Sequence, residues 1–401
     1  MSGWKECKLG DVGVVVTGKT PSSKNPDDFG NNIPFVTPTD YRNYNKSVSF
    51  SDRFLSSIGA DKLKKKILPP KSVMVTCIGS DMGKVAMNTI PVITNQQINS
   101  ILPDIKKVDP DFLYYKLVES YDVLRSYGLA GTAVPIVNKT DFEGIDVLLP
   151  PLPEQRAIAG ALSSLDDKID LLHRQNKTLE GMTEALWRKV FVEEADPGWK
   201  KGRLGDVVEE TIGGDWGEDI QSNDLIPVIC LRGVDLQHIK ENGFSSEAPI
   251  RFIKPTSLEK RKLNENEILI AGSGIGPIGK SIPINSALLK CYSYPVIYSN
   301  FCKRLRAESK EMAYFIEFMI YQFYKEGELD QFHMGTSVPN FNLKDFLNYE
   351  ITIPPRDIIS FFSSLLTDWY TKKFTNQIRT LSRLRDTLLP KLMSGEVRVA
   401  V

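Results

Sequence analysis

Four short clusters of polar side chains have the composition that proteins use to read the edges of nucleic acid bases. Arginine pairs well with guanine, and asparagine and glutamine pair with adenine. The clusters are Thr37, Thr39, Asp40 and Arg42; Asn95, Gln96 and Gln97; Arg232, Asp235 and Gln237; and Ser299 and Asn300. Each cluster alone is equally explained as a turn whose side chains bond to their own backbone. The sequence leaves both interpretations open.

Basic residues provide a second kind of chemistry, contact with phosphate. They form three runs and two lysines that directly follow a glycine: Lys62, Lys64, Lys65 and Lys66; Lys254, Lys260, Arg261 and Lys262; Lys303, Arg304 and Arg306; and Lys84 and Lys280. The chain contains 50 Lys plus Arg and 50 Asp plus Glu, so its formal net charge is zero. Overall charge therefore does not indicate a nucleic acid partner, and phosphate binding would depend on these local patches. The alternative for each run is ordinary solvated surface.

The segment Gly274–Ser281 matches the GxxxxGK[ST] pattern of nucleotide-binding phosphate loops. A helix must follow such a loop, because the phosphates bind at the helix N-terminus. The sequence continues instead with Ile282-Pro283-Ile284, and the corresponding segment 79–85 lacks the pattern. We therefore predict a glycine-rich turn between two strands, with Lys280 at its tip, and keep an ATP-binding enzyme as an alternative.

No residue pattern predicts a catalytic or metal centre. The sequence lacks the Asn-Pro-Pro-aromatic and Asp-Pro-Pro-aromatic tetrapeptides of amino-methyltransferases and a glycine-rich turn suited to S-adenosylmethionine. We expect Asp166-Asp167-Lys168 to lie on the exposed side of a helix. His173, His238 and His333 share no motif, and the five cysteines form no zinc pattern. The start of the chain does not resemble a signal peptide, and no apolar run is long enough for a membrane span, so we expect a cytoplasmic protein with reduced thiols.

These residues belong to a unit that the sequence contains twice. Trp4-Lys5 and Leu9-Gly10-Asp11-Val12 return as Trp199-Lys200 and Leu204-Gly205-Asp206-Val207. Gly131–Pro135, followed by Asn138, Asp141 and Phe142, returns as Gly335–Pro339, Asn342, Asp345 and Phe346. We predict that residues 1–195 and 196–401 each form a mixed α/β head followed by a rod. Short strands are expected at 12–16, 72–77, 92–94 and 145–149, and a helix at 112–125 that is repeated at 310–325.

Two segments with a recurring apolar position predict long helices. The first, Pro150–Val192, carries Ile158, Leu162, Leu165, Ile169, Leu172, Leu179, Leu186 and Val190. The second opens at Pro354 and carries Ile358, Phe362, Leu365, Trp369, Ile378, Leu381, Leu388 and Leu392. The predicted fold is two similar α/β heads separated by two long antiparallel coiled-coil helices, with a pseudo-two-fold internal repeat. The predicted domains are heads at 1–152 and 196–355, spacer helices at 153–195 and 356–393, and a C-terminal tail at 394–401.

The chain resembles the DNA-specificity subunits of type I restriction-modification systems over nearly its whole length. The resemblance rests on Leu9-Gly10-Asp11, Thr17–Pro21, Asn95-Gln96-Gln97, Leu149–Gln155 and Leu388–Glu396. The second half departs from the pattern, because Gly213-Gly214-Asp215-Trp216 replaces Thr17–Pro21, Ser299-Asn300 replaces the paired glutamines, and Pro354-Pro355-Arg356 lacks Glu-Gln.

The resemblance implies a non-catalytic target-recognition protein for double-stranded DNA. Each head would read one half of a bipartite, asymmetric target, and the rods would set the spacing and dock modification subunits. Adenine methylation with S-adenosylmethionine would belong to those subunits, and ATP-driven translocation and cleavage to a restriction subunit, so no cofactor is expected in this chain. The residues that we expect at DNA are Thr37, Thr39, Asp40, Arg42, Lys84, Asn95, Gln96, Gln97, Arg232, Asp235, Lys280, Asn300, Lys303 and Arg304. The alternative function is a structural coiled-coil adaptor whose heads bind proteins rather than DNA.

Overall fold

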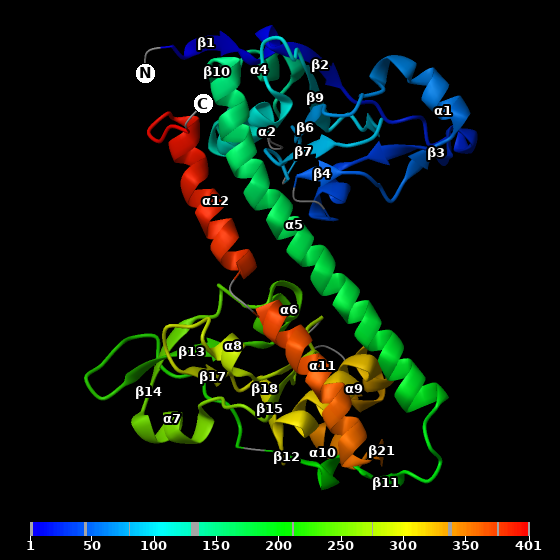
Figure 1. Cartoon of the computed structure of the whole chain (residues 1–401), viewed down its shortest axis with the longest axis vertical. Helices are drawn as coiled ribbons and strands as arrows, with labels where there is room; N and C mark the ends of the chain where they lie inside the picture. The colour runs from blue at the N-terminus through cyan, green and yellow to red at the C-terminus, as the bar shows by residue number, and fades with distance from the viewer. Residues whose placement is uncertain are drawn as a thin grey trace. The chain divides into compact units, whose positions relative to one another are not determined.

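The computed structural model describes residues 3–43, 46–79, 81–129, 136–210, 212–274, 276–335, 339–374 and 377–399. The chain divides into two compact units, Met1–Leu172 with Ile378–Val401, and His173–Gln377. Each unit contains one α/β head and parts of the long helical segments (Figure 1). We use "first head" for residues 1–152 and "second head" for residues 196–355.

The described residues of the first head form three sheets. Strands β1 and β10 form an antiparallel pair, five strands have the order β2-β9-β6-β7-β4, and three have the order β5-β3-β8. The strands are β1 (Lys5–Lys8), β2 (Gly13–Thr17), β3 (Phe29–Val36), β4 (Ser47–Val48), β5 (Phe54–Leu55), β6 (Val73–Thr76), β7 (Val85–Asn88), β8 (Ile93–Thr94), β9 (Ile98–Pro103) and β10 (Asp146–Leu149). The helices are α1 (Ser57–Lys62), α2 (Pro110–Glu119), α3 (Tyr121–Leu129) and α4 (Lys139–Glu143), with short 3-10 helices η1 (Leu9–Asp11), η2 (Pro26–Asp28), η3 (Pro38–Asn43) and η4 (Lys64–Lys66).

The second head is built in a similar way, but among its described residues the larger sheet has four strands, without a counterpart of β4, and there is an additional ribbon, β19-β20. Strands β11 and β21 form an antiparallel pair, four strands have the order β12-β18-β15-β16, and three have the order β14-β13-β17. The strands are β11 (Lys200–Arg203), β12 (Val208–Glu210), β13 (Ile226–Leu231), β14 (Ile250–Ile253), β15 (Glu267–Ala271), β16 (Ser281–Pro283), β17 (Val296–Tyr298), β18 (Cys302–Ala307), β19 (His333–Met334), β20 (Asn340–Phe341) and β21 (Glu350–Ile353). The helices are α6 (Gly233–Asn242), α7 (Pro255–Arg261), α8 (Ser286–Leu289), α9 (Lys310–Glu326) and α10 (Leu343–Leu347), with 3-10 helices η6 (Leu204–Asp206) and η7 (Glu328–Phe332).

The two heads share one topology, so the predicted internal repeat is confirmed. The order β2-β9-β6-β7 corresponds to β12-β18-β15-β16, and the parallel pair β3-β8 corresponds to the parallel pair β13-β17. Asn138 caps α4 by accepting a bond from the backbone N–H of Asp141, and Asn342 caps α10 from Asp345 in the same way. The repeated residues at 131–135 and 336–338 lie outside the described part of the chain.

The elements predicted from residue patterns agree with the structure at most places. Strands β2, β6, β8 and β10 lie on the four predicted strand segments. Asp109 caps α2 and Pro110 occupies its first turn, as capping preferences predict. The helix predicted at 112–125 is interrupted at Ser120, whose hydroxyl donates to the carbonyl of Lys116 (2.8 Å) and so competes with the helical bonding.

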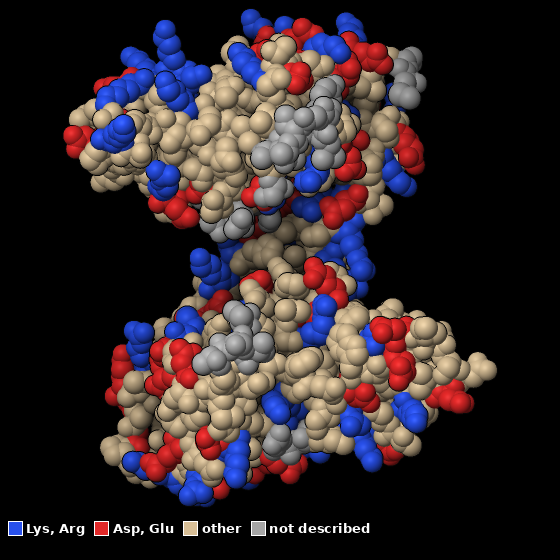
Figure 2. Space-filling view, turned by 180° about the vertical axis from the view of Figure 1, so that it is seen from behind, with Lys and Arg blue, Asp and Glu red and all other residues tan. Residues whose placement is uncertain are grey.

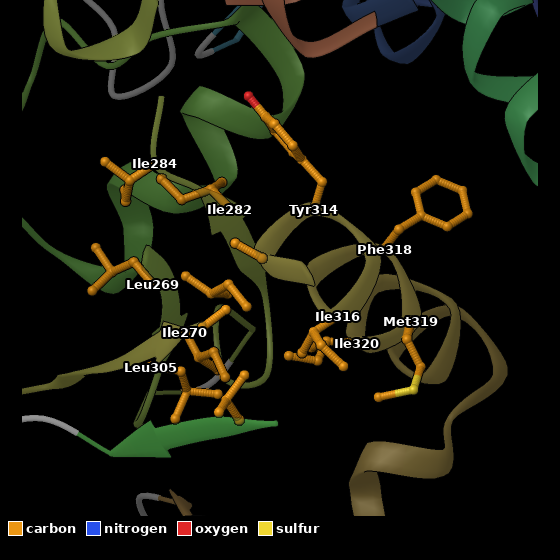
Figure 3. Packing of buried hydrophobic residues seen from close by; sticks show 14 of the residues in the cluster. Leu269, Ile270, Ile282, Ile284, Leu305, Tyr314, Ile316, Phe318, Met319 and Ile320 are labelled. Atoms are coloured by element: carbon orange, nitrogen blue, oxygen red, sulfur yellow. The ribbon is translucent and has the colours of Figure 1, made fainter. Parts of the chain in front are cut away.

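The core of the second head lies between its four-stranded sheet and α9. Leu269 and Ile270 of β15 and Leu305 of β18 face Ile316 and Ile320 of α9 (Figure 3). All five side chains are fully buried. Burying a side chain of this size stabilises a fold by about 1.5–3 kcal/mol. The loops that leave the ends of this sheet therefore begin at strands that are anchored in a packed core.

The predicted long helices are present. The first is α5 (Leu152–Arg188), which continues into a π-helical turn, η5 (Lys189–Glu193). The second is described as α11 (Arg356–Phe374) and α12 (Gln377–Met393), and residues 375 and 376 between them lie outside the described part. In the first unit, α12 runs antiparallel beside the start of α5 (Figure 1). Two contacts show this direction: Arg385 of α12 contacts Asp166 (2.8 Å), and Arg398, which follows α12, faces the earlier residue Glu154 (3.9 Å).

The proline-rich junction ties the start of α5 to the first head. The Gln155 side chain is almost fully buried, and its amide oxygen accepts a bond from the backbone N–H of Asp109 (2.8 Å). Its amide nitrogen donates to the carbonyl of Pro150 (2.8 Å). The neighbouring Glu154 carboxylate accepts a bond from the Trp4 indole (3.3 Å). The Glu-Gln pair thus connects the beginnings of β1, α2 and α5.

Two expectations for the helices are wrong. Leu365, predicted for the apolar stripe, is 41% exposed, and Leu366 is fully buried in its place. The cause is that α11 packs along α9, which buries a wider face, including Tyr370, than a coiled-coil seam would. Asp166, predicted on the exposed side of the helix, is buried, and it accepts bonds from Tyr115 (2.6 Å) and Arg385 (2.8 Å).

Candidate nucleic-acid interface

Backbone hydrogen bonds bring several loops together at one end of the first head. The turn after β8 bonds back to β3, since the N–H of Asn95 donates to the carbonyl at the end of that strand (3.1 Å). The loop after β2 lies against β8 through the N–H of Lys19 (2.9 Å), and the turn after β6 begins with a bond from Cys77 to the carbonyl of Gln97 (2.7 Å). Because β3 and β8 are parallel, their carboxyl ends meet at this edge, a common position for binding loops. We call residues 17–20, 37–40, 77–79, 81–84 and 95–97 the first loop edge.

The second head repeats these bonds at corresponding positions. The N–H of Ser299 donates to the carbonyl at the end of β13 (2.9 Å), and that of Asp215 to the carbonyl at the end of β17 (2.9 Å). The N–H of Gly272 donates to the carbonyl of Phe301 (2.8 Å). We call residues 213–216, 232–235, 272–274, 276–280 and 299–301 the second loop edge. The two edges therefore have the same backbone plan.

One glycine in each edge permits this close packing of loops. A Cβ atom on Gly18 would clash with the backbone oxygens of Thr94 and Asn95. A Cβ atom on Gly214 would clash with the backbone oxygens of residues 298 and 299. Because only glycine lacks this atom, each glycine lets the loop lie directly on the neighbouring turn.

The first loop edge presents polar side chains to solvent. Gln96 is exposed, and its side-chain oxygen accepts a hydrogen bond from the hydroxyl of Thr20, which orients the amide. Asn95 is buried and bonds to the side chain of Gln97 (2.8 Å) and to its backbone N–H (3.1 Å), so it shapes the turn from within. Lys19 and Thr39 are exposed beside this turn.

The second loop edge presents a different set of side chains. Asn300 is exposed, and the next residue, Phe301, is 65% exposed although it is aromatic. Trp216 is partly exposed, and the guanidinium of Arg251 lies 4.6 Å from its ring centre. The two edges thus share a backbone and differ in the chemistry of their surface.

Asp40 acts within the first loop edge and does not face solvent. Its side chain is only 3% exposed. It accepts bonds from the backbone N–H (2.7 Å) and hydroxyl (2.9 Å) of Thr37, from the Ser51 hydroxyl (3.1 Å) and from the N–H of Asp52 (3.0 Å). For Asp40 and Thr37, the interpretation as a turn bonded to its own backbone therefore describes the structure.

Asp235 has the corresponding role in the second loop edge. It is fully buried and accepts bonds from the N–H of Arg232 (2.8 Å) and from the hydroxyl of Ser245 (2.6 Å). The Arg232 guanidinium also donates two bonds to this carboxylate (2.8 and 3.1 Å). Hydrogen bonding to Asp235 raises the pKa of Arg232. The bonds between Arg232 and Asp235 thus stabilise the N-terminus of α6.

The phosphate-loop pattern lies in a turn between antiparallel strands. Strand β15 precedes it and β16 follows it from Ser281, so the position of the required helix is occupied by a strand. Lys280 donates to the side chain of Gln237 (2.8 Å), and the corresponding Lys84 pairs with Asp81 (2.7 Å). The prediction of a strand-to-strand turn is confirmed, but Lys280 does not lie at its tip. Lys280 directly precedes β16, and its carbonyl accepts a bond from the N–H of Ala271 at the end of β15 (2.8 Å), so it lies at the base of the turn.

Most of the basic runs lie on corresponding elements of the two heads. The first covers the end of α1 and η4, where Lys64 and Lys65 are exposed, and the second covers α7 and its end, where Lys260 is exposed. Figure 2 shows Lys and Arg side chains gathered over the lobe of the first head that carries α1. In the third run, Lys303 is half-buried on β18, whereas Arg304 is buried and donates to the carbonyl of Lys260 (3.0 Å).

The structure therefore gathers most of the predicted residues but gives them different positions. Thr39, Gln96 and Asn300 are exposed at the loop edges, whereas Asp40, Asp235 and Arg304 are interior. Arg42 lies in η3, and its side chain is outside the described part of the chain. Sequence reasoning missed Lys19 and Phe301 as surface residues of these edges. The signal for Phe301 was its position directly after Asn300, and the signal for Lys19 was its place in the Thr17–Pro21 motif, which Gly213–Trp216 replaces in the second half.

The described residues contain neither a metal-binding cluster nor a membrane-spanning helix. Among residues 3–43, 46–79 and the other described ranges, no group of three or more His, Cys, Asp or Glu side chains is arranged to hold a metal ion. Within the same part of the chain, every helix is too short or too polar to cross a bilayer.

Comparison with known proteins agrees with the doubled architecture. A family model described as "Type I restriction modification DNA specificity domain" matches residues 1–181 and again residues 197–378. The MjaIX specificity subunit of a type I restriction enzyme from Methanocaldococcus jannaschii is 27% identical over 424 residues, covering 99% of this chain and 94% of that protein. The HindI specificity subunit from Haemophilus influenzae is 37% identical over 150 residues, covering 37% of this chain and 32% of that protein.

A solved structure supports the fold over the full length. The type I restriction-modification S subunit from M. genitalium superposes with a TM-score of 0.62 at 14% identity, covering 97% of this chain and 96% of that chain. The two family matches together span most of the chain, each with one head and the start of its long helix. The chain therefore belongs to the family of type I restriction-modification DNA-specificity proteins, and its function is the recognition of DNA sequence within such a system.

Proposed function

We propose that this chain is the non-catalytic reading subunit of a type I restriction-modification complex, in which each loop edge recognises one half of a bipartite DNA target. The observation that carries the proposal is the pair of loop edges, which share their backbone bonds but expose different side chains. Gln96 stands in the first where Asn300 stands in the second. One scaffold with two unlike surfaces suits an asymmetric target.

The exposed amides would read base edges, and the basic helices would position the duplex. Glutamine and asparagine form paired hydrogen bonds with adenine in the major groove. The bond from Thr20 holds the Gln96 amide in one orientation, which favours a single base contact. Exposed lysines on α1, η4 and α7 would contact phosphates, which fix register without carrying sequence information.

Burial and side-chain bonding lead us to propose a smaller set of residues for contact with DNA. We retain Thr39, Gln96, Gln97 and Asn300 for bases, and Lys84, Lys280 and Lys303 for the DNA backbone. Thr37, Asn95 and Arg232 support the edges through the bonds described above, and the interior residues Asp40, Asp235 and Arg304 are not proposed to touch DNA. Arg42 stays in the proposal on its sequence position alone.

The partner subunits would provide the chemistry. Modification subunits would carry S-adenosylmethionine and methylate adenine, and a restriction subunit would carry ATP, so this chain needs no cofactor in the proposal. The long helices α5, α11 and α12 would dock the modification subunits. A net charge of zero is compatible with DNA binding when partners share the neutralisation of phosphates.

Methylation mapping tests the proposal. Genomic DNA from a host that contains the chain and its modification subunits is compared with DNA from the same host after deletion of this chain alone. We expect methylated adenines in a split motif that disappear on deletion. A chain that copurifies with a partner protein but leaves every methylated motif in place would instead support the adaptor function.

A further inference from the structure

We propose that Phe301 reads a thymine in the second half-site through contact with the 5-methyl group in the major groove. The inference rests on the proposed function and adds a specific chemistry to its second loop edge. Phe301 is 65% exposed at a position where the first loop edge has Gln97, as the matching backbone bonds from Gly272 and Cys77 show. An exposed phenylalanine beside the polar Asn300 calls for an apolar ligand group.

The turn that carries Phe301 is held on three sides, so its exposure is a fixed feature. Its carbonyl accepts the bond from Gly272 (2.8 Å), and the N–H of Cys302 bonds back to the carbonyl of Ser299 (3.0 Å) to close the turn. Gly214 packs directly on the backbone of Ser299. A turn closed in this way keeps the side chains of its two central residues, Asn300 and Phe301, at the surface.

The neighbouring chemistry favours a base edge as the ligand. Asn300 suits adenine, and the partner of adenine is thymine, whose methyl group is the one apolar group that base pairs present in the major groove. Basic residues of α7 lie near this turn. Arg261 of α7 donates to the carbonyl of Gly213 (2.9 Å), which belongs to the loop that packs on the turn. An apolar contact, an amide and a flanking cationic helix together match the surface of an A·T pair and its phosphates.

Replacement of thymine by uracil removes only the methyl group and gives a direct test. The whole complex of this chain with its modification subunits is bound to its mapped target, with each thymine of the second half-site replaced in turn by deoxyuridine. We expect one position to lose about fourfold in affinity, the effect of one buried methyl group. The Phe301→Ala complex should bind the thymine-containing target more weakly, and replacing that thymine by deoxyuridine should reduce its affinity no further. The Phe301→Leu complex should show a smaller loss on the same replacement than the wild-type complex.

Tyr294 offers a matched control, because it is a 40% exposed aromatic residue that precedes β17, at the opposite end of the strand from Phe301. Tyr294→Ala should leave affinity and the uracil effect unchanged. Equal uracil effects in wild-type and Phe301→Ala complexes would overturn the inference. So would failure of Phe301→Ala to assemble with the modification subunits, or increased fluorescence of a 2-aminopurine probe that reports insertion between bases. Failure of the proposed function is separate, since no mapped target would then exist.

Discussion

The two loop edges are alike in backbone and unlike in surface. In both heads, the turn after β8 or β17 bonds to the end of the neighbouring parallel strand, β3 or β13, and to the first residue after β6 or β15. A glycine, Gly18 or Gly214, packs directly on the backbone of the same turn. In the first head this frame exposes Gln96, fixed by Thr20, and in the second it exposes Asn300 and Phe301. The backbone bonds that support each edge do not involve the exposed side chains, so the surface can change while the backbone frame remains.

Two buried charged side chains on the long helices, Asp166 and Lys373, differ in their surroundings. In the first unit, Asp166 of α5 is buried but paired with Arg385 and bonded to Tyr115. In the second unit, Lys373 of α11 is buried beside the ring of Trp369 (5.1 Å), and burial lowers its pKa to about 8. The buried charge of Asp166 is thus matched by a cation, whereas burial makes the charge of Lys373 costly to keep.

The carboxylates inside the loop edges should give the largest effects on stability. Asp235→Ala should destabilise the second head by about 3 kcal/mol, because it leaves the Arg232 guanidinium and buried donors without their acceptor. Asp40→Ala should cost the first head about 2 kcal/mol, since it removes hydrogen bonds from N–H and hydroxyl groups only. Denaturant titration followed by hydrogen exchange of peptides from each head measures both. The exposed Asp224→Ala is the control, and equal effects of Asp224→Ala and Asp235→Ala would refute the assigned role.

Lys373 should make the second unit sensitive to pH. Its pKa is about 8 in the fold and 10.5 when unperturbed, so folding below pH 8 must keep a charge where burial disfavours it. Lys373→Met should therefore stabilise the unit by about 2 kcal/mol at pH 7. The gain should shrink between pH 8 and 10.5, where the unfolded lysine still binds a proton that the folded one releases.

Thermal unfolding of the Lys373→Met variant at several pH values checks this sign. The neighbouring exposed Lys372→Met removes the same charge without the burial and should change stability little at any pH. A gain for Lys373→Met that is as large at pH 10.5 as at pH 7 would show that packing, and not charge, explains it.

Exposed amides of the two edges should affect separate halves of the target. Gln96→Ala should relax discrimination about tenfold at one base of one half-site, and Asn300→Ala should do so at one base of the other, the order expected for a lost paired contact. Competition binding with singly substituted duplexes measures this for the complex with modification subunits. Relaxation by both variants at the same base would break the comparison between the heads.

Lysines of the corresponding basic helices should give the smallest effects. Lys64→Ala and Lys260→Ala should each weaken binding about threefold at low salt for all sequences alike, and each should reduce the slope of log affinity against log salt by about one. Titrations at four salt concentrations measure the slope. A change in sequence preference with an unchanged slope would show that the lysine contacts a base.

The repeat and the long helices could be predicted from residue patterns, because both depend on local spacing. The polar clusters could also be read from the sequence, but their gathering at one edge of each head and the burial of each member could not. Thr39 and Asp40 are adjacent residues of one predicted cluster, but only Asp40 is buried. Its burial depends on packing against Ser51, which lies eleven residues later in the sequence and donates a bond to Asp40. Likewise, Leu365 and Leu366 fit a helical stripe equally well until the contact of α11 with α9 selects one. Such choices depend on residues distant in sequence.

Exchange of the surface on a retained frame tests the central claim most directly. In the variant with Asn300→Gln and Phe301→Gln, the second loop edge acquires the glutamine pair of the first, and methylated motifs are mapped by sequencing in a host that lacks the wild-type chain. We predict a motif that keeps the first half-site and the gap and changes only in the second half-site. A motif that changes in the first half-site, or that stays identical in both, would contradict the account.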